Sequence, residues 1–143
     1  MIYRKWKFED NFEISQIEKE CFKEPWTFEM ISNTFLNDNF IGFVAQDGEN
    51  VVGYIAVLCC LDEAEINLVA VKENMRKRGI ASFLLNLVQE ELSKKGVKKI
   101  FLEVRKSNLG AQKLYAKSGF EIISIRPLYY SGKEDAYIMS KSL

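Results

Sequence analysis

The sequence of 143 residues contains no histidine, only two prolines and only three cysteines. The absence of histidine excludes serine–histidine triads and most zinc sites. Proton transfer in a catalytic site would therefore depend on Glu, Asp, Tyr, Lys or water. Cys21, Cys59 and Cys60 are odd in number and two of them are adjacent, which is a poor basis for disulfides. We expect all three cysteines to pack as ordinary side chains, and we expect no metal site.

An excess of charge and a long apolar run are also missing. The 20 basic and 20 acidic residues cancel, which argues against a strong general attraction to nucleic acid or to an anionic membrane. The longest apolar run, residues 54–61, is far too short to cross a bilayer as a helix, and the first residues lack the apolar core of a signal peptide. We therefore expect a cytoplasmic monomer with no direct nucleic-acid or membrane contact. With 48% apolar residues, one globular domain over residues 1–143 is expected.

The pattern of apolar residues predicts an alternation of strands and helices. The predicted strands cover residues 2–6, 40–45, 51–58, 65–71, 99–104, 120–126 and 134–140. The predicted helices cover residues 12–22, about 28–36, 80–95 and about 109–118. Thr27 and Asn108 are suitable N-caps, and Gly96 and Gly119 follow helix ends, where glycine is favoured. The order β-α-α-β-β-β-α-β-α-β-β predicts an α/β domain with a mixed sheet.

Two of these helices carry a predicted core-facing stripe. In the first helix the stripe consists of Phe12, Ile14, Ile17 and Cys21. In the third helix it consists of Ile80, Phe83, Leu84, Leu87, Val88 and Leu92, and the opposite, polar face carries Asn86, Gln89, Glu90 and Lys94.

A basic, glycine-containing turn precedes the third helix. Its sequence is Arg76-Lys77-Arg78-Gly79-Ile80-Ala81. A helix N-terminus offers unpaired N–H groups and a positive dipole, and glycine lets the backbone approach a ligand closely. With the added basic charge, the turn is suited to a pyrophosphate, although a solvated basic turn before an ordinary helix explains the same residues. It is neither a Walker loop nor a dinucleotide fingerprint.

The turn and the strand before it resemble the acetyl-coenzyme A motif of the GCN5-related N-acetyltransferases. The matching residues are Leu68, Val69, Ala70 and Val71, followed by Arg76-x-x-Gly79-x-Ala81, which fits that family's Gln/Arg-x-x-Gly-x-Gly/Ala pattern. The resemblance implies a mostly antiparallel sheet of about seven strands with about four helices. It also implies that backbone amides of residues 78–82, from Arg78 to Ser82, hold the pyrophosphate of acetyl-CoA. The strand segment 68–71 would then pair with the pantetheine arm, and Arg76 and Lys77 belong to the same binding loop.

The second half of the chain is similar to the bacterial ribosomal-protein alanine N-acetyltransferases within that family (the RimI type). The similarity rests on Glu103-Val104-Arg105-x-Ser107-Asn108, on Leu114-Tyr115 and on the tail Arg126-x-x-Tyr129-Tyr130 with Glu134-Asp135-Ala136. Pro25-Trp26-Thr27 and residues 61–64 match as well, so the similarity runs from about residue 25 to residue 139. Lys133, where arginine is usual, and the short loop between Tyr130 and Glu134 depart from the pattern and can alter acceptor choice.

Two residues are candidates for acid–base catalysis. Glu103 ends an apolar strand, where burial would raise the pKa of its carboxyl toward that of a general base. The alternative is an ordinary strand-end glutamate that reaches solvent or pairs with Arg105. Tyr115 lies on the apolar face of its helix, as a core aromatic would. The resemblance implies that Glu103 is the base and that Tyr115 is the acid that protonates the coenzyme A thiolate. Asn108 caps its helix and, by resemblance, contacts the coenzyme.

The acceptor side is predicted to be an acidic and aromatic groove for a peptide N-terminus. Its candidate residues are Trp26, Asp62, Glu63, Tyr129, Tyr130, Glu134 and Asp135. The alternative is that these are exposed charges and structural aromatics. The resemblance implies the N-terminal alanine of a small-subunit ribosomal protein as acceptor. Other possibilities are an acetyltransferase for a small amine, a non-catalytic acyl-coenzyme A-binding module and, least favoured, a purely structural domain.

Overall fold

The computed structural model describes residues 1–130, 132 and 134–143, without the side chain of Tyr130. Seven strands form one sheet: β1 (Ile2–Lys5), β2 (Phe40–Asp47), β3 (Asn50–Cys60), β4 (Glu63–Val71), β5 (Lys99–Arg105), β6 (Glu121–Tyr130) and β7 (Glu134–Ser142). Four α-helices accompany them: α1 (Asn11–Cys21), α2 (Phe28–Phe35), α3 (Ile80–Lys94) and α4 (Leu109–Lys117). The predicted element order and the mixed α/β fold are confirmed, although β6 continues to Tyr130, well beyond its predicted end at residue 126.

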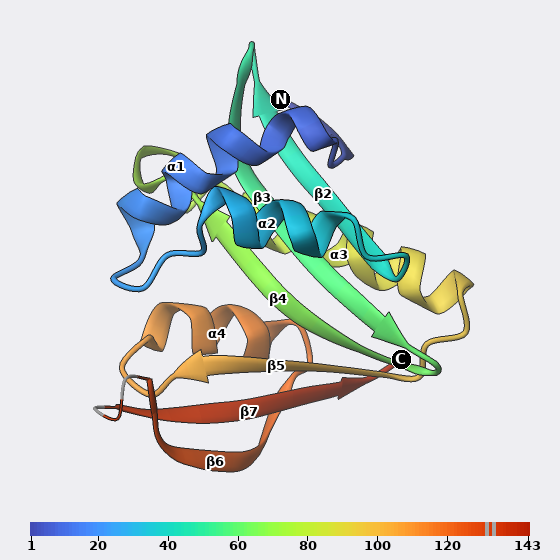
Figure 1. The fold of residues 1–143 in the computed structure, drawn as a ribbon. Coiled ribbons are helices and arrows are strands. Elements are labelled where there is room, and N and C mark those ends of the chain that lie inside the picture. The colour runs from blue at the N-terminus through green and yellow to red at the C-terminus, as the bar shows by residue number, and fades with distance from the viewer. Residues whose placement is uncertain (131, 133) are drawn as a thin grey trace.

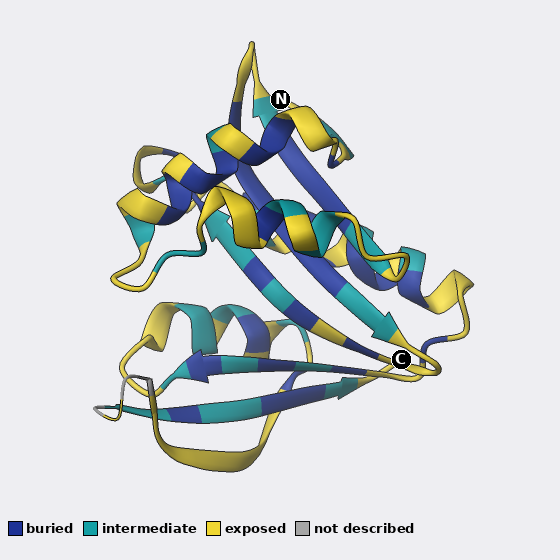
Figure 2. Ribbon diagram, in the orientation of Figure 1, coloured by how far each residue is buried: buried dark blue, intermediate teal, exposed yellow. Residues whose placement is uncertain are grey.

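The sheet has the strand order β1-β2-β3-β4-β5-β7-β6. Every neighbouring pair is antiparallel except β4 and β5, which are parallel. Helices α1 and α2 cover one face of the sheet over β2–β4, and α3 covers the other face (Figure 1). Buried and partly buried residues predominate in β2–β4, whereas residues 121–129 of β6, at the sheet edge, are exposed (Figure 2). No described helix is long and apolar enough to cross a membrane.

Two apolar clusters, one on each face, hold the helices to the sheet. The larger cluster joins α3 and α4 to the sheet and includes Leu84, Leu102 and Tyr115. The smaller cluster lies under α1 and α2 and includes Ile14 and Tyr54. Alternation along β5 therefore sends Leu102 and Val104 into the larger cluster and Glu103 to the opposite face.

The stripe predicted for α1 is partly wrong. Phe12 is 62% exposed and packs beside Phe28 of α2, with ring centroids 6.4 Å apart. Asn11 takes the sheet-facing position, and its Oδ1 accepts a hydrogen bond from Trp6 Nε1 at 2.6 Å. Glu18, two helical turns further along the same face of α1, is also buried. Hydrophobic periodicity does not identify these positions, because their polar atoms are buried with hydrogen-bond partners.

The stripe predicted for α3 is partly wrong for the same reason. Gln89, assigned to the polar face, is buried, and its side chain accepts a hydrogen bond from Lys141 and donates one to the Leu85 carbonyl. Phe83, assigned to the core, is 47% exposed and stacks on Tyr3 with ring centroids 4.0 Å apart. The buried face of α3 therefore includes Leu85 and Gln89 and excludes Phe83.

The buried carboxyl of Glu18 fixes the loop between α1 and α2. One oxygen accepts a hydrogen bond from Tyr54 Oη at 2.5 Å, and the other accepts one from the Trp26 backbone N–H at 3.1 Å. Burial raises the pKa of Glu18, and the two hydrogen bonds act in the opposite direction without cancelling it. The folded protein therefore holds this proton more tightly than the unfolded chain does.

We predict that Glu18→Gln changes the pH dependence of stability. The raised pKa means that the contribution of Glu18 is greatest at low pH and is lost as pH rises through the folded-state value. Glutamine imitates the protonated form, so the free energy of unfolding of the variant should rise relative to wild type between pH 4 and pH 8. Urea unfolding at several pH values measures this. Glu20→Gln, an exposed change in the same helix, is the control. A difference that favours wild type more as pH rises would contradict the prediction.

Candidate active site

The parallel strands β4 and β5 pair only over their first halves. Their register runs from Glu63 opposite Lys99 to Ile66 opposite Leu102 and then stops. Beyond that point β4 continues to Val71 along β3, and β5 continues to Arg105 along β7. The two strands thus part, and we call the region between the segment 68–71 and the segment 103–105 the fork.

The fork leaves one backbone edge of β4 without a β5 partner. This edge belongs to Leu68, Val69, Ala70 and Val71, the residues expected to pair with the pantetheine arm. A register shift opposite Ala56 and Val57 places Asn67 in a β-bulge just before the segment. Unpaired strand edges bind extended ligands through backbone hydrogen bonds, so the segment has the form that a pantetheine arm requires.

The two predicted catalytic residues lie on opposite faces of the sheet. Tyr115 is 5% exposed and belongs to the cluster under α3 and α4, where its ring centroid is 5.8 Å from that of Phe120. Glu103 belongs to the other face, and 19% of its side chain is exposed. A reacting group can lie between these two residues only if it enters the fork.

Glu103 pairs with Arg126, and not with Arg105 as the sequence alternative allowed. Arg126 Nη1 of β6 lies 3.1 Å from Glu103 Oε1. The Arg126 guanidinium carbon lies 4.7 Å from the centroid of the Tyr129 ring. A hydrogen bond to Glu103 raises the pKa of Tyr129, with smaller contributions from burial and from the Glu103 charge. Glu103, Arg126 and Tyr129 thus form a connected polar group at the fork.

A residue that the sequence did not single out, Glu65, belongs to the same group. In the register it faces Phe101, two residues before Glu103, so both carboxylates lie on the same face of neighbouring strands. Burial raises the pKa of Glu65, the charge of Glu103 raises it further, and Arg126 lowers it. Sequence alone gives no signal for this role, because the fork that brings β4, β5 and β6 together is a feature of the tertiary fold.

The predicted phosphate-binding turn leads directly into α3. Gly79 is the N-cap residue with φ +80°, and no side chain caps the helix. Lys77 also has a left-handed backbone, with φ +64°. The first N–H groups of a helix lack partners within the helix, so those of Ile80, Ala81 and Ser82 are available to an anion. Arg78 is exposed beside them.

Arg76, the first residue of the glycine motif, has a local partner. Its Nε donates a hydrogen bond to the Val71 carbonyl at 3.0 Å, and its Nη2 lies 3.5 Å from Cys21 Sγ. The side chain therefore ties the turn to the end of β4 and to α1. The position therefore needs a long side chain with hydrogen-bond donors for this structural contact, independently of any contact with phosphate.

Asn108 caps α4 as predicted. Its Oδ1 accepts a hydrogen bond from the Ala111 N–H at 3.1 Å. The cap orients the helix that carries Tyr115. A contact between Asn108 and the coenzyme stays a prediction.

Most of the predicted acceptor residues lie near the fork. Trp26 is held there by Glu18, and its neighbour Glu24 lies 4.0 Å from Arg105 at the end of β5. Glu134 accepts a hydrogen bond from the Ser107 hydroxyl at 2.7 Å, and Asp135 accepts one from the Leu128 N–H at 2.9 Å. Asp135 therefore links β6 to β7, and Glu134 links β7 to the segment that follows β5. The side chain of Tyr130 and the residue Lys133 lie outside the described residues.

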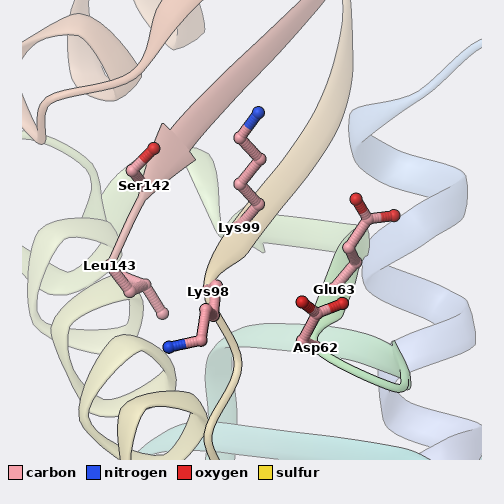
Figure 3. A pocket seen from close by; sticks show the side chains of 6 residues that line it. All are labelled: Asp62, Glu63, Lys98, Lys99, Ser142 and Leu143. Carbon is pink, nitrogen blue, oxygen red and sulfur yellow. The ribbon is translucent and has the colours of Figure 1, made fainter.

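Asp62 and Glu63 do not belong with this group, contrary to the prediction. They lie at the start of β4, where Glu63 pairs with Lys99, and they line a separate pocket of about 370 Å³ with the end of β7 (Figure 3). Lys99 and Glu103 are four positions apart on β5, which is about 13 Å along a strand. The error arises because the sequence does not show at which end of the sheet the β3–β4 turn lies.

Comparison with known proteins gives one consistent result. Residues 11–120 match the model of the acetyltransferase (GNAT) family. The [ribosomal protein bS18]-alanine N-acetyltransferase of Escherichia coli K12 is 32% identical over 127 residues, which cover 87% of this chain and 85% of that protein. The protein of the same name from Haemophilus influenzae is 30% identical over 129 residues, with 87% of each chain covered. A crystal structure of the Escherichia coli ribosomal-protein alanine N-acetyltransferase matches with a TM-score of 0.92 at 28% identity, covering 99% of this chain and 92% of that one.

We predict that Gly79→Ala weakens coenzyme A binding. A side chain at φ +80° costs about 1–2 kcal/mol of stability. A Cβ at Gly79 would meet no neighbour within 4 Å, so the strain lies in the backbone of the turn that presents the N–H groups. We expect the dissociation constant of coenzyme A, measured by calorimetry, to rise at least about tenfold, which corresponds to 1.4 kcal/mol. Gly48→Ala, in the β2–β3 turn at φ +62°, is a matched control because its Cβ also meets no neighbour. Equal coenzyme A affinity in the two variants would show that the turn does not hold the phosphates.

Proposed function

This chain belongs to the acetyltransferase (GNAT) family, and from that premise we propose that it transfers the acetyl group of acetyl-CoA to the N-terminal α-amine of a protein. We further propose alanine as the preferred terminal residue and a small-subunit ribosomal protein as the acceptor, because two relatives that are at least 30% identical carry that acceptor in their names. The observation that carries the proposal is the fork, with Glu103 on one face of the sheet and Tyr115 on the other.

The residues around the fork fit the chemistry of acetyl-CoA, the donor of this family. The N-terminus of α3 would hold the pyrophosphate through backbone N–H groups of residues 78–82. The free edge of residues 68–71 would pair with the amides of the pantetheine arm. Acetyl-CoA supplies an activated acyl group as a thioester. Everything else in the reaction is the positioning of the amine and the movement of protons.

We assign to Glu103 the role of accepting the proton of the acceptor ammonium. An α-amino group has a pKa of about 7.7–8.0 and is partly neutral at pH 7, whereas a lysine side chain at about 10.4 is almost wholly protonated. A single carboxylate, acting directly or through water, therefore meets the demand of an N-terminal amine more easily than that of a lysine. This supports an α-amine as the acceptor.

The transfer then needs an oxyanion partner and an acid. The neutral amine attacks the thioester carbonyl and the C–N bond forms. The nitrogen then loses its second proton to solvent water, and the C–S bond breaks as the thiolate leaves. A backbone N–H near Val71 would stabilise the oxyanion. Tyr115 would protonate the thiolate, which is uphill by about 1.5 pKa units, or about 2 kcal/mol, from reference values of about 10 and 8.5. The transfer therefore has to be concerted with C–S cleavage, and the tyrosinate that remains regains a proton from water.

The acceptor would lie on the face of the sheet that carries Glu103. Trp26 and Tyr129 supply aromatic surface on either side of the fork, and Glu65 adds a second carboxylate beside Glu103. Such a surface suits a cationic N-terminus followed by an extended peptide.

The first prediction of this proposal concerns the acceptor. Purified protein with acetyl-CoA and a peptide that has the alanine N-terminus of that ribosomal protein should add one acetyl group to the α-amine, as located by tandem mass spectrometry. The same peptide with a blocked N-terminus should gain none, even where it contains lysine. Acetylation confined to lysine or to small amines would contradict the proposed acceptor.

The second prediction concerns Glu103. Glu103→Gln should lower kcat by about 10²–10⁴, the usual contribution of a general base, and leave the dissociation constant of acetyl-CoA within about twofold. Glu121→Gln, an exposed change on β6, serves as the control. Turnover that is unchanged in Glu103→Gln at every pH would remove Glu103 from the mechanism.

A further inference from the structure

One carboxylate oxygen of the proposed base, Glu103, already contacts a cation of the protein in this structure. Arg126 Nη1 lies 3.1 Å from Glu103 Oε1, within the distance of a charge-assisted hydrogen bond. A protonated α-amine is also a cation with N–H donors, and it must approach the same carboxylate to lose its proton. The guanidinium and the acceptor ammonium therefore compete for Glu103. This inference rests on the proposed function.

Arg126 is free to move without disturbing the core. Its side chain is 53% exposed, and it lies on β6, the edge strand of the sheet. The β6–β7 register is interrupted between Arg126 and Tyr130, and Leu128 within that interval has φ +48°. The guanidinium is also stacked on the exposed ring of Tyr129, and no apolar contact of the two core clusters includes it. Among the residues that the structure describes, a rotation of the side chain thus costs contacts with Glu103 and Tyr129.

Glu65 offers a second position for the guanidinium. It shares a face with Glu103 on the neighbouring strand. Its carboxyl also interacts electrostatically with both groups, because the charge of Glu103 raises the pKa of Glu65 and the charge of Arg126 lowers it. The three groups have a net charge of −1. An incoming ammonium makes the site neutral, provided that Arg126 stays close to a carboxylate. Glu65 is the carboxylate that can keep it there while Glu103 receives the amine.

We propose that the protonated acceptor amine displaces Arg126 from Glu103 and that Glu65 receives the displaced guanidinium. Arg126 and Glu65 are then positioning residues that set the affinity for cationic acceptors, and binding is an exchange of one cation for another. A neutral acceptor cannot make this exchange, so the device favours an ammonium group over neutral ligands of the same shape.

The exchange predicts changes in KM of opposite sign for two variants. Arg126→Gln removes the competitor, so KM for an alanine-initiated peptide should fall at least about threefold. Arg126→Lys, which keeps a cation but loses the stacking on Tyr129, should lower KM less than Arg126→Gln does. Glu65→Gln removes the second position, so KM should rise at least about threefold. In the Arg126→Gln background the effect of Glu65→Gln should be much smaller, because coupled residues are not additive. Glu121→Gln is the control for the loss of a surface carboxylate.

Two kinetic results would overturn the inference. A rise in KM for Arg126→Gln would mean that Arg126 binds the acceptor directly. An equal effect of Glu65→Gln with and without Arg126 would mean that Glu65 acts only as a surface charge. KM for acetyl-CoA should stay constant throughout, which separates acceptor exchange from a general structural effect.

A binding measurement separates this inference from the proposed acceptor. The side-chain resonances of Arg126, assigned by comparison with Arg126→Lys, should shift when L-alaninamide is added to the wild-type protein. They should not shift with N-acetyl-L-alaninamide, whose acetylated nitrogen carries no positive charge. This result supports the exchange even if no alanine peptide is acetylated. An Arg126 signal that responds to both compounds, or to neither, overturns it.

Discussion

The parting of β4 and β5 is the constraint on which the site depends. Parallel pairing ends at Ile66 and Leu102, and each strand continues along its other neighbour. The extra residue of the bulge, Asn67, shifts the register at this point, and bulges increase the local twist of a strand. The parting has a visible cost, because Asn67 Oδ1 is buried and has no hydrogen-bond partner among the residues that the structure describes. In return, it exposes a backbone edge and lets a substrate contact both faces of one sheet.

The electrostatics of the molecule are local. The chain as a whole is neutral, but its basic turn lies at the N-terminus of α3. The carboxylates of Glu65 and Glu103 lie on one face of β4 and β5, at the fork. An anionic coenzyme and a cationic amine are therefore attracted to different places. The Arg126 guanidinium pairs with Glu103 until an acceptor arrives, which links the affinity of the site to the charge of the ligand.

The fold and the coenzyme side were predictable because their signals are local. Caps such as Thr27 and Asn108, the turn at Gly48 and the glycine at position 79 each impose a backbone geometry that short stretches of sequence show. The errors arose where tertiary contacts decide. Asn11 and Gln89 are buried because distant partners satisfy them, and Phe12 packs on another helix instead of the sheet. The partner of Glu103, the role of Glu65 and the separate position of Asp62 and Glu63 depend on which strands become neighbours.

The most direct test of the proposed site at the fork is a crystal structure with a bisubstrate compound. This compound joins an alanine-initiated peptide to coenzyme A through the α-nitrogen of the peptide. We expect the pantetheine amides to hydrogen-bond to the backbone of residues 68–71. The linked nitrogen should lie within hydrogen-bond reach of Glu103 or of one water bound to it, and the sulfur should face Tyr115. A compound that binds outside the fork, or with Glu103 and Tyr115 both remote from the joined atoms, would contradict it.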